Sequence, residues 1–110
     1  MKVWIDGAIV NASEARVSVL DHGLLYGDGI FEGIRAYARG VFRLDDHLAR
    51  LAVSAKAISL ALPHPIRAIR DIVLDTLRAF GRDDAYVRLV VTRGEGALGV
   101  DPTSCPTPRL

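Results

Sequence analysis

Tyr86 and Arg88 form the first pair of residues whose types and spacing could do chemistry. They lie in residues 85–93, a segment rich in β-branched residues that predicts a strand. Side chains two residues apart in a strand share a face, so a phenol hydroxyl and a guanidinium would project together. Such a pair of donors can hold a carboxylate. The same spacing fits a surface strand whose arginine packs along apolar neighbours, and the residues alone leave both interpretations open.

A second candidate is the glycine-rich stretch LLYGDGIFEGIRAY, residues 24–37. Gly27, Gly29 and Gly33 form the pattern G-x-G-x-x-x-G, which is one residue longer than the dinucleotide-binding fingerprint. In that fingerprint and in the P-loop, a helix follows the glycines and turns its N–H groups towards a phosphate. Here an alternating, strand-like segment follows them. The stretch therefore does not predict a nucleotide site.

Alternation along this predicted strand separates two faces. The odd-numbered residues share one face: Phe31, Gly33, Arg35 and Tyr37. The even-numbered residues share the other: Ile30, Glu32, Ile34 and Ala36. A glycine inside a strand costs conformational entropy and leaves room, so Gly33 predicts that another group approaches the backbone. We expect a pocket wall lined by Phe31, with a bulge or a tight helix contact at Gly33 as an equally weighted alternative.

The segments that must position these residues include two predicted hairpins. Residues 3–10 are apolar around Asp6-Gly7, a dipeptide favoured in two-residue hairpin turns. Residues 30–37 and 41–44 form the second pair of strands, with Arg39-Gly40 at the turn. Two hairpins predict an antiparallel sheet.

The remaining pattern predicts two helices. Apolar residues recur every three or four positions from Leu44 to Ile58, which indicates one helical stripe, with Asp45 as the N-cap and an end before Pro63. A second stripe runs from about Pro65 to Gly81, a residue suited to the left-handed position after a helix. The predicted fold class is α+β, an antiparallel sheet with two helices packed on one face.

Composition limits the functional classes. With 110 residues and a formal net charge of +1, the chain has the size of one domain and no electrostatic case for nucleic acid. Its apolar runs are far shorter than the roughly 20 residues needed to cross a bilayer, and it lacks a signal peptide, which predicts a cytoplasmic location without a membrane partner. Cys105 is the lone cysteine, and the three histidines are widely spaced, so no metal site is expected.

Three motifs carry a resemblance to a known family. They are DHGLLYGDGIFEGIRAY at residues 21–37, FRLDDHLARL at 42–51 and AYVRLVVTRGEGALGVDP at 85–102. In order and spacing they resemble the class IV, or fold type IV, pyridoxal-phosphate aminotransferases, most closely the branched-chain amino acid aminotransferases. The resemblance covers essentially the whole chain and corresponds to the smaller N-terminal domain of that family.

The resemblance implies roles for individual residues. Arg50 matches the arginine that binds the phosphate of pyridoxal 5′-phosphate, a role that suits a permanently charged bidentate donor. Tyr86 and Arg88 match a pair that handles substrate carboxylates, while Phe31 and Tyr26 match aromatic residues of the side-chain pocket. Gly33 is expected to face the substrate beside Phe31. In related enzymes the residues at the positions of Tyr26 and Val100 reach the partner subunit's site, which implies at least a homodimer.

Transamination also needs a lysine that forms a Schiff base with the cofactor. The chain has only Lys2 and Lys56, and neither matches the family lysine. In related enzymes that lysine belongs to the C-terminal domain, so we expect no catalytic residue in residues 1–110 and an inactive chain by itself. Because the sequence stops at Arg109-Leu110, where an apolar strand could begin, we expect residues 1–110 to be the N-terminal domain of a longer protein.

Three functional hypotheses follow from the residues and the resemblance. The first is a branched-chain aminotransferase that exchanges an amino group between leucine, isoleucine or valine and 2-oxoglutarate. The second is another activity of the same class, a D-amino acid aminotransferase or an aminodeoxychorismate lyase. The loop at 94–100 lacks the arginine and histidine typical of the D-amino acid enzymes, and the run from Phe31 to Tyr37 makes the lyase less favoured. The third is a freestanding, non-catalytic binding or assembly domain.

Overall fold

The computed structural model describes residues 1–110, and its centre is a three-stranded antiparallel sheet. The strands are β3 (Gly29–Tyr37), β4 (Gly40–Val41) and β5 (Ala85–Thr92), in the order β4-β3-β5. β3 and β5 pair without interruption from Gly29 opposite Thr92 to Ala36 opposite Ala85. Since β4 pairs only with the last two residues of β3, most of the outer edge of β3 has no neighbouring strand.

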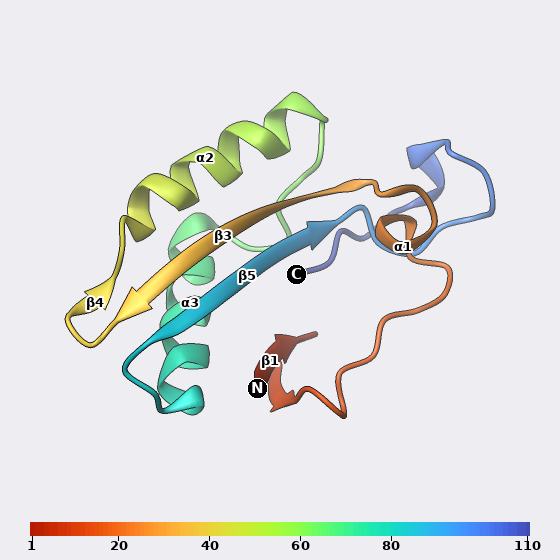
Figure 1. Ribbon diagram of the computed structural model, residues 1–110. Coiled ribbons are helices and arrows are strands. Elements are labelled where there is room, and N and C mark those ends of the chain that lie inside the picture. The colour runs from red at the N-terminus through yellow and green to blue at the C-terminus, as the bar shows by residue number, and fades with distance from the viewer.

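Two helices cover one face of this sheet (Figure 1). They are α2 (Leu44–Ala57) and α3 (Ile66–Phe80). Their apolar stripes meet the even-numbered side of β3 and the matching side of β5, and the buried cluster includes Ile34, Leu51, Ile69 and Val91. No helix is long and apolar enough to cross a membrane. The predicted α+β class, with helices on one face of an antiparallel sheet, is confirmed.

The first hairpin forms as predicted but does not join the central sheet. β1 (Lys2–Ile5) and β2 (Ala8–Asn11) make a separate two-stranded sheet beside α3. Asp6 and Gly7 both have positive φ, 50° and 86°, as a tight hairpin turn requires. The Trp4 ring meets the His64 ring edge-on at 5.5 Å, which holds the hairpin against the segment before α3.

Two predicted details at the start of α2 are wrong. The second hairpin strand is shorter than residues 41–44, because Arg43 turns into a left-handed conformation (φ 51°) and the helix begins at Leu44. Arg43, not Asp45, is the N-cap residue, and its side chain makes no cap hydrogen bond. Asp45 lies in the first turn and accepts a hydrogen bond from Arg70 Nε of α3 at 3.0 Å. At α3, the predicted start after Pro65 and end at Gly81 are confirmed.

The structure adds two short helical segments to the predicted elements. α1 (His22–Tyr26) is capped by the carboxylate of Asp21, and the 3₁₀ helix η1 spans Pro102–Ser104. Both lie at the end of the sheet where β5 leaves it (Figure 1). Beyond η1 the chain returns to β5, where Arg109 and Thr92 exchange two backbone hydrogen bonds of 2.9 and 3.1 Å.

Candidate functional site

The face of the sheet without helices carries four of the predicted site residues. Phe31 and Gly33 come from β3 and Tyr86 and Arg88 from β5; together they are called the strand cluster. The guanidinium carbon of Arg88 lies 3.7 Å from the centroid of the Phe31 ring, a cation–π contact. Arg88 Nη1 lies 3.4 Å from the Tyr86 hydroxyl, a long contact that leaves both groups free to bind a ligand. The predicted proximity of Tyr86 and Arg88 is therefore confirmed.

Gly33 makes room for a neighbour within the strand cluster. A Cβ at this position would lie 2.4 Å from the Tyr86 hydroxyl oxygen and 3.1 Å from its ring carbon Cζ, so any side chain would displace the tyrosine. The strand contains no bulge here, because Gly33 pairs in register with Arg88. A group does approach the backbone at Gly33, and that group is the Tyr86 side chain.

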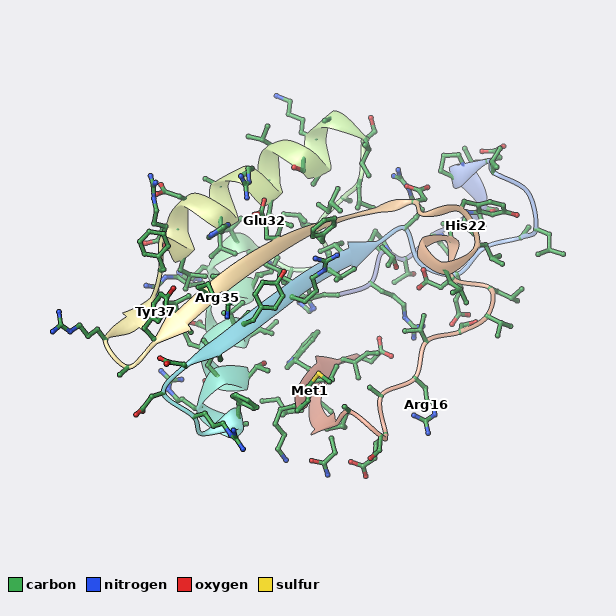
Figure 2. The ribbon with its side chains drawn as sticks, viewed as in Figure 1. Met1, Arg16, His22, Glu32, Arg35 and Tyr37 are labelled. Atoms are coloured by element: carbon green, nitrogen blue, oxygen red, sulfur yellow. The ribbon has the colours of Figure 1, made fainter.

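Arg50 is an exposed side chain that is hydrogen-bonded to a buried carboxylate. Its Nε donates to Glu32 Oε1 at 2.8 Å and its Nη2 donates to Oε2 at 2.6 Å. The Glu32 side chain, between β3 and α2 (Figure 2), is only 3% exposed, whereas that of Arg50 is 67% exposed. Hydrogen bonds from Arg50 lower the pKa of Glu32, and burial opposes that shift only in part.

His47 completes this group, which is called the Glu32 triad and consists of Glu32, His47 and Arg50. His47 Nδ1 lies 2.8 Å from Glu32 Oε2. Because an ionised carboxylate can only accept, Nδ1 carries the proton and donates it. Arg50 Nη2 also lies 3.5 Å from Nδ1, but two donors face each other there and no hydrogen bond results.

The Glu32 triad and the strand cluster occupy opposite faces of the sheet. Neighbouring residues of β3 alternate between the faces, so Phe31 and Gly33 point away from the helices and Glu32 points towards α2. β3 alone separates them, and its edge between residues 29 and 35 is not paired with another strand. A ligand that lies along that edge can contact both the Glu32 triad and the strand cluster.

Tyr26 contacts Gly99, the residue before Val100, at the end of the sheet. The backbone N–H of Gly99 donates to the Tyr26 hydroxyl, which places Val100 next to α1. The Val100 side chain is 75% exposed. Behind Tyr26, the buried His22 ring packs edge-on against the tyrosine at 4.8 Å, and its Nε2 lies 2.8 Å from the carbonyl oxygen of Ala97. The structure thus brings the loop at Gly99 and Val100 to Tyr26 through the Gly99 hydrogen bond, and Arg50 takes no part in this contact.

Two surface grooves lie elsewhere, and neither contains a predicted site residue. Both grooves lie between α3 and the turn at Gly40 and Val41. Arg43 and Arg70 also line the first groove, and Tyr37 also lines the second. The candidate site is an exposed surface in this chain, since Phe31, Arg50, Tyr86 and Arg88 are all exposed. The lysines do not contribute to it, since Lys2 Nζ donates to Asn11 Oδ1 at 2.8 Å in the hairpin and Lys56 is exposed at the end of α2.

Comparison with known proteins adds a family assignment to this geometry. The family described as amino-transferase class IV matches residues 29–110. The chain belongs to the class IV aminotransferases.

Similar proteins give the same assignment in more detail. A Methanocaldococcus jannaschii protein named "Putative branched-chain-amino-acid aminotransferase" is 52% identical over all 110 residues. The solved branched-chain aminotransferase of Thermoproteus uzoniensis, with norvaline, is 42% identical with a TM-score of 0.87 and matches 99% of the chain. The solved branched-chain aminotransferase of Escherichia coli is 33% identical with a TM-score of 0.89 and matches 96%. The chain spans 38% of each of the first two proteins and 36% of the third.

Members of the class with other activities are also similar. A D-alanine aminotransferase of Staphylococcus haemolyticus is 35% identical over 109 residues and 38% covered. The solved 4-amino-4-deoxychorismate lyase of Pseudomonas aeruginosa is 38% identical, with a TM-score of 0.78 over 96% of the chain and 36% of the lyase. Membership of the class therefore does not by itself fix the substrate.

Within this class IV chain, the sequence analysis missed the partners of Arg50. Alternation placed Glu32 only on the inward face of its strand, and spacing left His47 as one of three isolated histidines. The available signal was a charged residue on an otherwise apolar strand face, followed by a histidine and an arginine three positions apart on the next helix. A buried carboxylate needs partners, and that spacing supplies two donors on one side of the helix.

Proposed function

We propose that residues 1–110 are the N-terminal domain of a pyridoxal-phosphate-dependent branched-chain amino acid aminotransferase. The reaction exchanges an amino group between leucine, isoleucine or valine and 2-oxoglutarate. The observation that carries the proposal is the 52% identity over the whole chain to a relative of that name, joined by close structural similarity to solved branched-chain enzymes. A cytoplasmic location stays a prediction.

The residues of the Glu32 triad fit the phosphate of the cofactor. Glu32 takes the side of the Arg50 guanidinium formed by Nε and Nη2, which leaves both N–H groups of Nη1 and one of Nη2 for another acceptor. These outer donors belong to a side chain that is largely exposed, so a phosphate dianion can reach them. When bound, pyridoxal phosphate supplies the electrophilic carbon and the electron-withdrawing ring that transamination needs.

The strand cluster supplies donors and an apolar wall for the substrate. The Tyr86 hydroxyl and the Arg88 guanidinium together offer a carboxylate two donors, in support of the proposed substrate role. Phe31 is exposed beside them, and it presents an aromatic ring to an aliphatic side chain. Gly33 would act through Tyr86, because the absence of a side chain at position 33 leaves room for the tyrosine ring.

The loop at residues 94–100 favours a branched-chain substrate over a D-amino acid. It contains no arginine or histidine, and Leu98 and Val100 are exposed apolar residues. Arg93, just before the loop, is already bound to the Asp28 carboxylate through Nε and Nη2, both at 3.0 Å. We propose that Tyr26 and Val100 contact the partner subunit's site in a homodimer, where their exposure would be lost.

The amine nucleophile is proposed to come from a C-terminal domain. Within this chain, Lys2 is hydrogen-bonded in the hairpin, and Lys56 lies about 1.7 turns beyond Arg50 on α2. The 38% coverage of relatives supports such an additional domain. Residues 1–110 would then bind, orient and enclose the reactants without forming a bond to them.

Substrate assays on the complete polypeptide test this proposal. With L-leucine and 2-oxoglutarate we expect formation of the branched 2-oxo acid and glutamate, in a reaction that depends on added pyridoxal phosphate. D-alanine is the control substrate, and it should react at least about a hundredfold more slowly, as expected when a carboxylate or side chain meets the wrong subsite. Conversion of D-alanine alone, or release of pyruvate from aminodeoxychorismate, would move the protein to another activity of its class. A polypeptide without bound cofactor or any transfer activity would favour a binding domain.

A further inference from the structure

We propose that Glu32 and His47 are positioning residues that hold Arg50 in the orientation needed for the cofactor phosphate. The inference rests on the proposed function, because it needs Arg50 to meet that phosphate. It assigns a purpose to two residues that touch neither substrate nor cofactor. Its structural basis is the arrangement of hydrogen bonds in the Glu32 triad.

The two hydrogen bonds from Arg50 to Glu32 fix the plane of the guanidinium. The group is flat and rigid, so once Nε and Nη2 are bound the direction of Nη1 is also determined. The fork formed by the outer hydrogens of Nη1 and Nη2 remains free and points away from Glu32. An arginine held in this way binds a phosphate without first giving up the freedom of a long side chain.

His47 in turn restrains the carboxylate. Its Nδ1–H donates to Oε2, the same oxygen that accepts from Arg50 Nη2. Glu32 therefore accepts three hydrogen bonds, and both of its oxygens are occupied. His47 and Arg50 lie three residues apart on α2, so one helix carries both donors to a single acceptor on β3.

The burial of Glu32 is difficult to explain as stabilisation alone. A carboxylate taken out of water costs free energy that an ion pair often fails to repay, and an apolar residue could fill the same position among Ile30 and Ile34. Arg93 uses the same two nitrogens on the Asp28 carboxylate, but there both side chains are largely buried. Arg43 meets Asp46 through one hydrogen bond of 2.8 Å, with both side chains about two-thirds exposed. The exposed arginine at position 50 is instead anchored to an acid only 3% exposed.

The test compares two cofactor forms on the complete polypeptide. Equilibrium dissociation constants are measured for pyridoxal 5′-phosphate and for pyridoxal, which lacks the phosphate. Arg50→Ala should weaken binding of the phosphate form by about a hundredfold, and Glu32→Gln by about tenfold, as expected for the loss of charge-assisted and orienting hydrogen bonds. Neither change should alter the affinity for pyridoxal by more than about twofold. Asp46→Asn, which removes an exposed carboxylate from the same helix, is the matched control and should change neither constant.

A double variant separates positioning from general structural support. If Glu32 acts through Arg50, adding Glu32→Gln to Arg50→Ala should cause no further loss of phosphate-form affinity. Equal weakening of pyridoxal and pyridoxal phosphate by Glu32→Gln, or additive losses in the double variant, would overturn the inference. If Glu32→Gln does not fold, Glu32→Asp and His47→Gln carry the same comparison, each with a smaller expected loss confined to the phosphate form.

Failure of the inference is distinguishable from failure of the proposed function. A normal affinity for pyridoxal phosphate in Arg50→Ala would remove the phosphate role of Arg50 and, with it, the inference. Weak binding in Arg50→Ala together with normal binding in Glu32→Gln, Glu32→Asp and His47→Gln would reject only the positioning role. The proposed phosphate contact would then stand without its support from β3.

Discussion

At the scale of the residue, the most consequential feature is an acid inside an apolar layer. Glu32 lies between Ile30 and Ile34 on the helix-facing side of β3, and it remains ionised because Arg50 and His47 donate to it. The hydrogen bonds from Arg50 hold its pKa below the ordinary value of 4.5. The folded state therefore gains stability from the ionised form of Glu32, and that gain depends on pH.

The difference in unfolding free energy between the native chain and Glu32→Gln should reflect this dependence. The contribution is fully present above the unfolded pKa, and it is lost as pH falls through the lower folded pKa. We expect Glu32→Gln to cost about 1–3 kcal/mol at neutral pH, with the difference shrinking steadily below about pH 4.5. Urea unfolding of both chains across the acid range measures it. A difference that does not change with pH would mean that Glu32 acts through packing alone.

Gly33 permits a second prediction at this scale. Because an added methyl would lie 2.4 Å from the Tyr86 hydroxyl oxygen, Gly33→Ala should rotate Tyr86 away from Arg88. The cost in stability should stay below about 1 kcal/mol, since the tyrosine is half exposed and alanine suits a strand better than glycine. In the complete enzyme we expect a raised KM for substrate and unchanged cofactor binding. Combination with Tyr86→Ala is the control, and a further loss there would show a role of Gly33 that does not pass through Tyr86.

At the scale of the element, the loop after β5 depends on close backbone packing. Gly94 has φ 89°, and a Cβ there would lie only 2.0 Å from the carbonyl oxygen of Thr107. This close packing positions the segment after Thr107, in which Arg109 pairs with Thr92. Arg109 also reaches Asp6 of the first hairpin at 3.0 Å and Glu95 at 3.1 Å, so one residue joins three parts of the chain.

Substitution of Gly94 should therefore destabilise the chain more than substitution of a strained but open glycine. We expect Gly94→Ala to cost about 3 kcal/mol, from backbone strain and steric overlap together. Gly27→Ala is the matched control: its φ is 66°, no atom lies within 4 Å of its Cβ position, and strain alone predicts about 1–2 kcal/mol. Thermal unfolding compares the two. Equal losses would show that the segment at Thr107 moves aside without cost.

Elements with a strong period were predictable, whereas those set by tertiary contacts were not. Alternation in residues 30–37 and the stripe from Leu44 to Ala55 gave β3 and α2 because burial on one side repeats at the period of the element. α1 has five residues and depends on Asp21, which caps it and accepts from Thr92 Oγ1 at 3.0 Å across the chain. No local pattern contains such a contact. For the same reason the sequence analysis predicted a role for Arg50 but not its contacts with Glu32 and His47, which join a strand to a helix.

At the scale of the whole molecule, the chain is a flat body measuring 44 × 31 × 18 Å. Helices cover one face of its sheet (Figure 1). The other face exposes aromatic and apolar side chains, among them Phe31, Tyr86 and Val90. An exposed aromatic surface of this kind is typical of a face that another domain or chain covers. This agrees with the proposal that a second domain completes the site.

Residues 1–110 produced alone should consequently associate with themselves. We expect concentration-dependent association above the 11.9 kDa monomer and binding of a hydrophobic dye, both reduced by Phe31→Ser. Val53→Ser, on the exposed side of α2, is the control and should leave both unchanged. Sedimentation and dye fluorescence provide the measurements. A monomer that binds no dye would show that the uncovered face needs no partner.

The contact between Gly33 and Tyr86 also constrains how this sheet can change in evolution. The two residues lie diagonally across β3 and β5, and one has no side chain where the other needs the space. A mutation that gives position 33 a side chain moves the Tyr86 hydroxyl away from Arg88, unless position 86 has already become smaller. We therefore expect natural variants to change the two positions together and in opposite directions of size, so that an ancestral switch of substrate would require paired substitutions and not a single step.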